Sequence, residues 1–147
     1  MLTTDLIIIG AGPGGYETAL LAARRGLSVA LIERGEVGGT CLNEGCIPTK
    51  ALCRTAAMVS DFAEAEAFGI KDVAFTLDFP AVMERKRAVV KQLRDGVESL
   101  ISNPNIHLLR GEARFVDALT VEAAGERVTA KDVIIATGSS SAMLPIE

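Results

Sequence analysis

A glycine-rich turn between an apolar strand and a helix is the feature that most constrains how this chain folds. Residues 6–9 form a continuous apolar run, as expected of a buried parallel strand, and residues 10–15 then match the pattern G-x-G-x-x-G. Residues 14–25 carry apolar side chains at helical spacing, and a second apolar strand follows at residues 28–32. This order predicts a βαβ unit with a right-handed crossover, and therefore an α/β, Rossmann-like fold with a mostly parallel sheet.

Each glycine of the pattern has a mechanical reason in a dinucleotide-binding turn. Gly10 makes the tight turn, Gly12 lets the backbone approach a pyrophosphate, and Gly15 lets the helix pack closely on the strand. The N–H groups and the dipole of the helix N-terminus would then hold the phosphates. The pattern therefore predicts a dinucleotide site at this turn.

An acid at the end of the second predicted strand narrows the choice of dinucleotide. Glu33 lies about 20 residues beyond the glycines, where a carboxylate accepts hydrogen bonds from ribose hydroxyls. A 2'-phosphate would meet a like charge there, which disfavours NADP and leaves FAD or NAD. The alternative is a glycine-rich turn that binds nothing, with Glu33 a solvated acid.

Two cysteines five residues apart indicate redox chemistry. In a regular α-helix the Cα atoms of Cys41 and Cys46 would lie about 8.6 Å apart, whereas a disulfide needs roughly 4.4 to 6.8 Å. A disulfide therefore requires a distorted turn, which Gly45 makes sterically possible. The loop that it would close is too short for the bond to stabilise the fold greatly, and a helix starting near Pro48 would favour thiolate over thiol, so thiol–disulfide exchange is the better interpretation.

Two other interpretations of the cysteines remain open. They are two buried, unreactive thiols, or a zinc site formed by Cys41, Cys46, Cys53 and His107, although this spacing fits no usual zinc pattern. Cys53, one to two turns into the helix, is most simply a small core residue. His107 falls in a predicted strand and is more often structural than catalytic.

The rest of the chain predicts further helices and strands around the βαβ unit. An irregular loop opens at residues 38–40, a helix runs from Pro48 to about residue 60, and a second helix runs from residues 78–80 to about residue 101. Short strands are expected at residues 106–109, 112–116, 120–123, 126–129 and 132–137. The strands at residues 112–116, 120–123 and 126–129 are interpreted as an antiparallel β-meander.

Composition argues against several partners. A net charge of −4 and a pI near 5.1 give no electrostatic footprint for nucleic acid or an anionic membrane. No apolar run reaches membrane-spanning length, and no signal peptide is indicated, so a cytoplasmic location is expected. At 147 residues the chain is expected to form one domain over residues 1–147, and no metal site is predicted.

The segment at residues 38–50, Gly-Gly-Thr-Cys-Leu-Asn-Glu-Gly-Cys-Ile-Pro-Thr-Lys, resembles that of the class of pyridine nucleotide-disulfide oxidoreductases. Together with residues 14–16 and the strand at residues 133–139, it looks most like the dihydrolipoamide dehydrogenases. The resemblance extends over essentially the whole chain. It implies the N-terminal segment of an FAD-binding domain, with the nicotinamide-binding and dimerisation domains of the family absent from this chain.

The resemblance also implies which residues hold FAD. The glycine turn would hold the pyrophosphate, Glu33 the adenosine ribose, and backbone at residues 111–113 the adenine. Residues 137–139 would close over the cofactor, and Gly39 and Thr40 would line the flavin. The full set of implied cofactor-binding residues is Gly10, Gly12, Pro13, Gly14, Gly15, Glu33, Arg34, Gly39, Thr40, Cys41, Cys46, Lys50, Gly111, Ala113, Ala136, Thr137, Gly138 and Ser139.

Three residues would carry the catalysis by the same resemblance. Cys41 would be the interchange thiol that attacks the substrate, Cys46 the thiol nearest the flavin, and Lys50 a cation near flavin N5. The plain alternative for Lys50 is a solvated helix lysine. Glu44 stands where an aliphatic residue is more usual in the class, and its charge would oppose thiolate formation.

The implied reaction passes electrons from a dithiol to the disulfide, then to FAD and then to NAD as co-substrate. The implied partners are a lipoamide-type small or protein-bound disulfide, a 2-oxoacid dehydrogenase complex and, in the full-length form, a second copy in a homodimer. The other hypothesis is a truncated non-enzymatic module that binds a nucleotide or a partner through the same surface.

Overall fold

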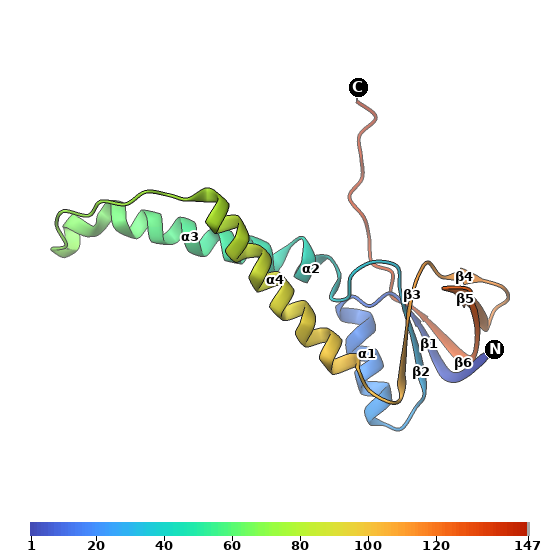
Figure 1. Cartoon of the computed structure of the whole chain (residues 1–147). Coiled ribbons are helices and arrows are strands. Elements are labelled where there is room, and N and C mark those ends of the chain that lie inside the picture. The colour runs from blue at the N-terminus through green and yellow to red at the C-terminus, as the bar shows by residue number, and fades with distance from the viewer. Residues whose placement is uncertain (147) are drawn as a thin grey trace. The chain divides into compact units, whose positions relative to one another are not determined.

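The computed structural model describes residues 1–146, which form two compact units (Figure 1). The first comprises Met1–Gly39 together with the chain from Val97 onward, and the second is Thr40–Gly96. The prediction that both make one FAD-binding domain stays a prediction. No helix within residues 1–146 is both long enough and apolar enough to cross a membrane.

The first unit is built on a six-stranded sheet in the order β3-β2-β1-β6-β5-β4. Its strands are β1 (Leu2–Ile9), β2 (Val29–Glu33), β3 (Ile106–Arg110), β4 (Arg114–Phe115), β5 (Thr120–Ala123) and β6 (Glu126–Ile135). β1 pairs in parallel with β2 and β6, and β2 pairs in parallel with β3. The predicted α/β, Rossmann-like class with a mostly parallel sheet is confirmed.

The core lies on both faces of β1 and β2, which explains their continuous apolar sequences. Ile7 and Ile32 belong to a buried cluster that also includes Val121 and Val128 from β5 and β6. Ile8, on the opposite face of β1, is fully buried on the side of helix α1 (Pro13–Arg24). The predicted strand–helix–strand order of residues 6–32 is therefore confirmed.

The antiparallel meander forms as predicted, but its last strand is much longer than expected. β4 pairs with β5 and β5 with β6, both antiparallel, while the strand predicted at residues 112–116 is reduced to Arg114–Phe115. The strands predicted separately at residues 126–129 and 132–137 are one strand, β6. The reason is that β1 pairs with β6 from Val128 to Ile135, so the exposed polar pair at positions 131 and 132 does not interrupt it.

The second unit is mainly helical where the sequence predicts a loop and two helices, and residues 69–78 within it are not helical. The expected irregular loop is largely helical: α2 (Gly39–Asn43) and α3 (Cys46–Glu64) leave only two residues between them, and α3 begins two residues before Pro48. A 3₁₀ turn, η1 (Ala65–Phe68), follows α3, and α4 (Phe79–Ile101) has the predicted bounds. Proline at the third position of α3 is compatible with helix because the first-turn N–H groups have no intrahelical acceptor.

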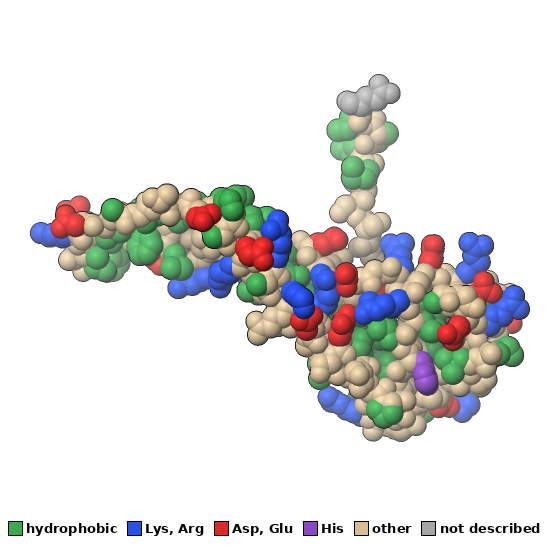
Figure 2. All heavy atoms as spheres, viewed as in Figure 1, with side chains coloured by type: hydrophobic (Ala, Val, Ile, Leu, Met, Phe, Trp, Pro, Cys, Tyr) green, Lys and Arg blue, Asp and Glu red, His purple; other side chains and the backbone are tan. Residues whose placement is uncertain are grey.

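Much of the apolar surface of the helical unit is exposed, as Figure 2 shows. On α4, Val90 is buried but Leu93 is 43% exposed, although the two apolar side chains are three positions apart and share a face of the helix. Phe62 of α3 packs against Phe75 with ring centroids 5.4 Å apart, yet both rings remain partly exposed. The apolar face of α4 is therefore only partly covered by the described residues.

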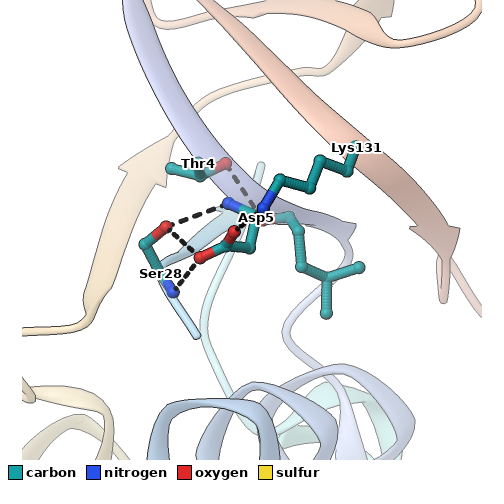
Figure 3. A network of polar contacts seen from close by, with 5 residues as sticks. Thr4, Asp5, Ser28 and Lys131 are labelled. Carbon is teal, nitrogen blue, oxygen red and sulfur yellow. Dashed lines mark hydrogen bonds and ion pairs between the residues drawn. The ribbon is translucent and has the colours of Figure 1, made fainter. Parts of the chain in front are cut away.

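A polar network joins β1, the start of β2 and β6 near the amino ends of β1 and β2 (Figure 3). The Asp5 carboxylate accepts hydrogen bonds from Lys131 Nζ at 2.6 Å, from the Ser28 N–H at 3.0 Å and from the Ser28 hydroxyl at 2.8 Å. These bonds, that of Lys131 foremost, hold the pKa of Asp5 well below its usual range. The network therefore favours the ionised carboxylate in the folded chain.

Replacing Asp5 with asparagine should lower the midpoint of thermal unfolding at pH 7. Since the folded-state pKa of Asp5 is depressed, its contribution is present above the ordinary carboxyl pKa of about 3.9 and is lost as the pH falls below it. The difference in unfolding midpoint between wild type and Asp5→Asn, measured by circular dichroism, should therefore become smaller as the pH is lowered from 5 to 2. Asp61→Asn, at an exposed position of α3, is the matched control. A difference independent of pH would contradict this account.

Candidate functional site

A pocket of about 320 Å³ lies at the carboxyl ends of the parallel strands in the first unit. Here the chain leaves β1 for α1, while β6 lies on the other side of β1 from β2, so the strand order reverses at β1. Open α/β sheets bind ligands in the crevice at such a reversal. The pocket is lined by Ile9, Gly10, Ile32, Glu33, Arg34, Gly111, Glu112, Ala113, Thr137, Gly138, Ser139 and Ser140.

The structure brings eight of the sequence-predicted cofactor residues together around this pocket. They are Gly10, Glu33, Arg34, Gly111, Ala113, Thr137, Gly138 and Ser139. Six others belong to the first unit but do not line the pocket: Gly12, Pro13, Gly14 and Gly15 at the start of α1, Gly39 at the start of α2, and Ala136 directly after β6. The remaining four belong to the second unit. The sequence did not single out Ile9, Ile32 or Ser140, although the first two are last or next-to-last residues of strands that end at this edge.

The glycine turn is packed as its pattern predicts. Gly10 has φ +101°, and a Cβ there would collide with the carbonyl oxygen of Ala136. A Cβ at Gly15 would collide with the carbonyl oxygen of Gly10, so only glycine lets α1 approach β1 this closely. These two glycines are required by the fold itself.

Two other glycines of the turn leave space instead. A Cβ at Gly14 would meet nothing within 4 Å, and one at Gly12 would lie 3.7 Å from the Cα of Gly39, an ordinary contact. Gly12 is also the N-cap of α1 and offers the first turn no side-chain hydrogen bond. The start of α1 thus combines room for a ligand with N–H groups that an anion can satisfy.

Glu33 is fixed at the pocket by two backbone hydrogen bonds. Its Oε2 accepts from the Ala11 N–H at 2.7 Å and its Oε1 from the Gly35 N–H at 2.8 Å. The carboxylate therefore joins the glycine turn to the end of β2, which a freely solvated acid would not do. Each oxygen keeps a further lone pair that a ligand hydroxyl can use.

Cys41 and Cys46 form a disulfide in the second unit, with their Cα atoms 4.7 Å apart. The predicted distortion is present: α2 ends at Asn43, and Gly45, with φ −115° and ψ −101°, separates it from α3. The carbonyl oxygen of Thr40 accepts from the N–H groups of both Glu44 and Gly45, at 2.9 and 2.7 Å. Both cysteines are exposed, so the alternative of two buried, unreactive thiols is wrong.

The third cysteine differs from its prediction. Cys53 is free and exposed, so it is not the core residue that was predicted. The buried residues of α3 are Pro48 and Ala51. Lys50 and His107 are also exposed. No group of three or more His, Cys, Asp or Glu side chains within residues 1–146 is arranged to hold a metal ion, and the disulfide takes up two of the four ligands of the alternative zinc site.

Curated relatives share the sequence over nearly the whole chain. A dihydrolipoyl dehydrogenase of Chlamydia muridarum is 44% identical over 144 residues, which cover 96% of this chain and 31% of that protein. One of Geobacillus stearothermophilus is 43% identical over 148 residues, or 98% of this chain and 32% of that protein. The chain thus spans about a third of the length of these relatives.

Structure and family comparisons agree with these relatives. The Cu(II) complex of RclA, an HOCl-induced flavoprotein disulfide reductase of Escherichia coli, superposes with a TM-score of 0.80 at 31% identity, covering 99% of this chain and 31% of that one. The pyridine nucleotide-disulphide oxidoreductase family profile matches residues 4–147. The chain therefore belongs to the pyridine nucleotide-disulphide oxidoreductase family.

Proposed function

We propose that this chain is the FAD-binding part of a dithiol–disulfide oxidoreductase of the dihydrolipoamide dehydrogenase type. The observation that carries the proposal is the exposed Cys41–Cys46 disulfide, formed across a break between two helices. The dihydrolipoyl dehydrogenases that resemble the chain, and the family to which it belongs, support the choice of reaction.

Thiol–disulfide exchange explains this disulfide better than stabilisation of the fold does. The two cysteines are separated by only five positions, so the bond removes little conformational entropy from the unfolded chain. Cys46 is the first residue of α3, where the helix dipole stabilises a thiolate once the bond is reduced. A reductant can reach either cysteine from solvent because both are exposed.

The first unit has the features that an FAD site needs. The uncapped start of α1 and the space at Gly12 and Gly14 fit a pyrophosphate, while Glu33 fits a ribose. Residues 111–113 and 137–139 line the same pocket and would hold the adenine side of the cofactor. When bound, the flavin supplies a two-electron carrier between the dithiol and a nicotinamide.

The finer assignments follow the family resemblance. Cys41 would attack the substrate, Cys46 would lie toward the flavin, and Lys50 would supply a cation beside it. Thr40 and Gly39 would line the ring. We further propose a lipoamide-type disulfide as substrate, NAD as co-substrate, a 2-oxoacid dehydrogenase complex as partner, a homodimer in the longer protein, and a cytoplasmic location.

Reduction by dihydrolipoamide tests the proposal. In a Cys53→Ser background without oxygen, dihydrolipoamide should free both remaining cysteines of the native chain for alkylation. Its two thiols lose two electrons and two protons and become lipoamide, while the protein S–S bond breaks and each sulfur gains a proton. If alkylation required a denaturant, or if reduction left no lipoamide, the redox proposal would be wrong and the non-enzymatic module would be favoured.

Replacing Glu33 with glutamine should weaken FAD binding at least about tenfold, because an amide NH₂ group then faces a backbone donor that the carboxylate now satisfies. Fluorescence titration with FAD measures the affinity, and circular dichroism verifies that the variant is folded. The control is Glu126→Gln, at the exposed start of β6 and outside the pocket lining. Equal affinities for Glu33→Gln and wild type would argue against a role of Glu33 in the site.

A further inference from the structure

A hydrogen bond from α4 reaches the turn that separates the two cysteines. Arg94 Nε donates to Asn43 Oδ1 at 3.0 Å, and both side chains are partly buried. Arg94 and Asn43 are 51 positions apart, so this contact ties the turn to a distant part of the same unit. Asn43 is the last residue of α2 and lies between Cys41 and Cys46 in the sequence.

Several further hydrogen bonds of this turn are local. The Thr40 carbonyl oxygen accepts from Glu44 and Gly45, and the Gly45 carbonyl oxygen accepts from the Thr49 N–H at 3.1 Å. These bonds define the shape of the turn. Because both partners belong to the turn or its flanks, the bonds do not hold it against another part of the unit. A bond to α4 instead fixes the end of α2 against a long helix, and so restrains how far Cys41 can move from Cys46.

We propose that Arg94 is a positioning residue of the redox pair, which acts through Asn43 to keep the turn in the conformation that closes the disulfide. This inference rests on the proposed function, since it concerns the exchange reaction of the same cysteines. The two sulfurs must separate when their bond is reduced, so a contact that restrains the turn favours the closed form. Its loss lowers the effective concentration of one thiol at the other.

The planar side chain of arginine suits this role better than lysine would. The Nε–H lies in the guanidinium plane, has a fixed direction and accepts no hydrogen bond, so it pairs with an amide oxygen in one orientation. Lysine keeps the positive charge but offers a flexible ammonium. A Lys substitution therefore separates the directed hydrogen bond from the charge.

The experiment measures the equilibrium between the Cys41–Cys46 pair and glutathione in the Cys53→Ser chain, by acid quenching and thiol alkylation. Two glutathione thiols give two electrons and two protons to the protein disulfide and form glutathione disulfide. Arg94→Met, Arg94→Lys and Asn43→Ala should each shift the equilibrium toward the dithiol by about threefold or more. The double variant Arg94→Met with Asn43→Ala should shift it no further than either single one.

Arg87→Met is the matched control, because Arg87 lies on the same helix, carries the same charge and makes an exposed ion pair with Glu84. Its equilibrium should equal that of wild type. A purely structural role of Arg94 would lower the unfolding midpoint equally in the oxidised and reduced chains and leave the equilibrium unchanged, which would overturn the inference. If only Arg94→Met shifted the equilibrium, and Arg94→Lys and Asn43→Ala did not, the shift would be due to the lost charge and the inference would also be overturned. If the wild-type pair does not exchange with glutathione at all, the proposed function fails instead.

Discussion

Replacing Gly15 with valine is expected to unfold the first unit and abolish FAD binding. A Cβ at this position collides with the backbone carbonyl of Gly10 and lies 3.5 Å from Ile8 Cγ2. The Gly10 carbonyl cannot move away without displacing α1 from β1, so the substitution should lower the free energy of unfolding by about 3 kcal/mol or more, a large share of the stability of a domain. Thermal unfolding followed by circular dichroism, together with FAD fluorescence, should show both losses.

Gly14→Ala is the control for this substitution. A Cβ at Gly14 meets nothing within 4 Å, and alanine is preferred to glycine inside a helix by up to about 1 kcal/mol. The Gly14→Ala chain should therefore fold at least as well as wild type, so that any loss of FAD binding there reports on the ligand alone. A Gly15→Val chain with a wild-type unfolding midpoint would show that α1 does not pack on β1 as described.

Replacing Cys46 with serine should trap a mixed disulfide on Cys41. When Cys41 attacks glutathione disulfide, the bond of that disulfide breaks, one glutathione leaves as the thiol and the other stays attached to Cys41. In the reduced wild-type chain Cys46, held across the same turn, then attacks Cys41 and releases the second glutathione. Without Cys46 this step is lost, and the adduct should accumulate at least about tenfold above wild type, given the high effective concentration of a neighbouring thiol.

Two features of the design make this result interpretable. Glutathione disulfide is used because a cyclic disulfide such as lipoamide keeps a second thiol that would release Cys41 again. Cys53 is replaced by serine in every chain because it is a free, exposed thiol that would react independently. Intact-mass measurement gives the number of adducts per chain. If Cys46→Ser and wild type carried equal amounts of adduct, Cys46 would have no resolving role.

The sequence predicted those parts of the fold in which local chemistry and tertiary packing agree. The glycine pattern and the apolar runs predicted the βαβ unit, and Pro80 marked the start of α4. The short strands between turns predicted the meander. The distortion at Gly45 followed from a simple distance argument, since a regular helix cannot bring Cys41 and Cys46 within bonding reach.

The remaining features depend on contacts that no local pattern encodes. Strand β6 is continuous because β1 pairs with it from Val128 to Ile135. The polar residues at positions 131 and 132 made this segment look like two separate strands in the sequence. Cys53 is exposed because α3 buries little of its surface in this chain. Likewise, nothing at Asn43 or Arg94 taken alone indicated that the two side chains would meet across 51 positions.

The visible absorption spectrum of the chain after incubation with FAD and removal of unbound cofactor tests the central claim most directly. The proposed site predicts a yellow protein with one FAD per chain, whose cofactor is displaced by ADP because the adenosine half occupies the pocket beside Glu33. A colourless wild-type chain, which loses FAD as completely as the Gly15→Val variant does, would contradict it.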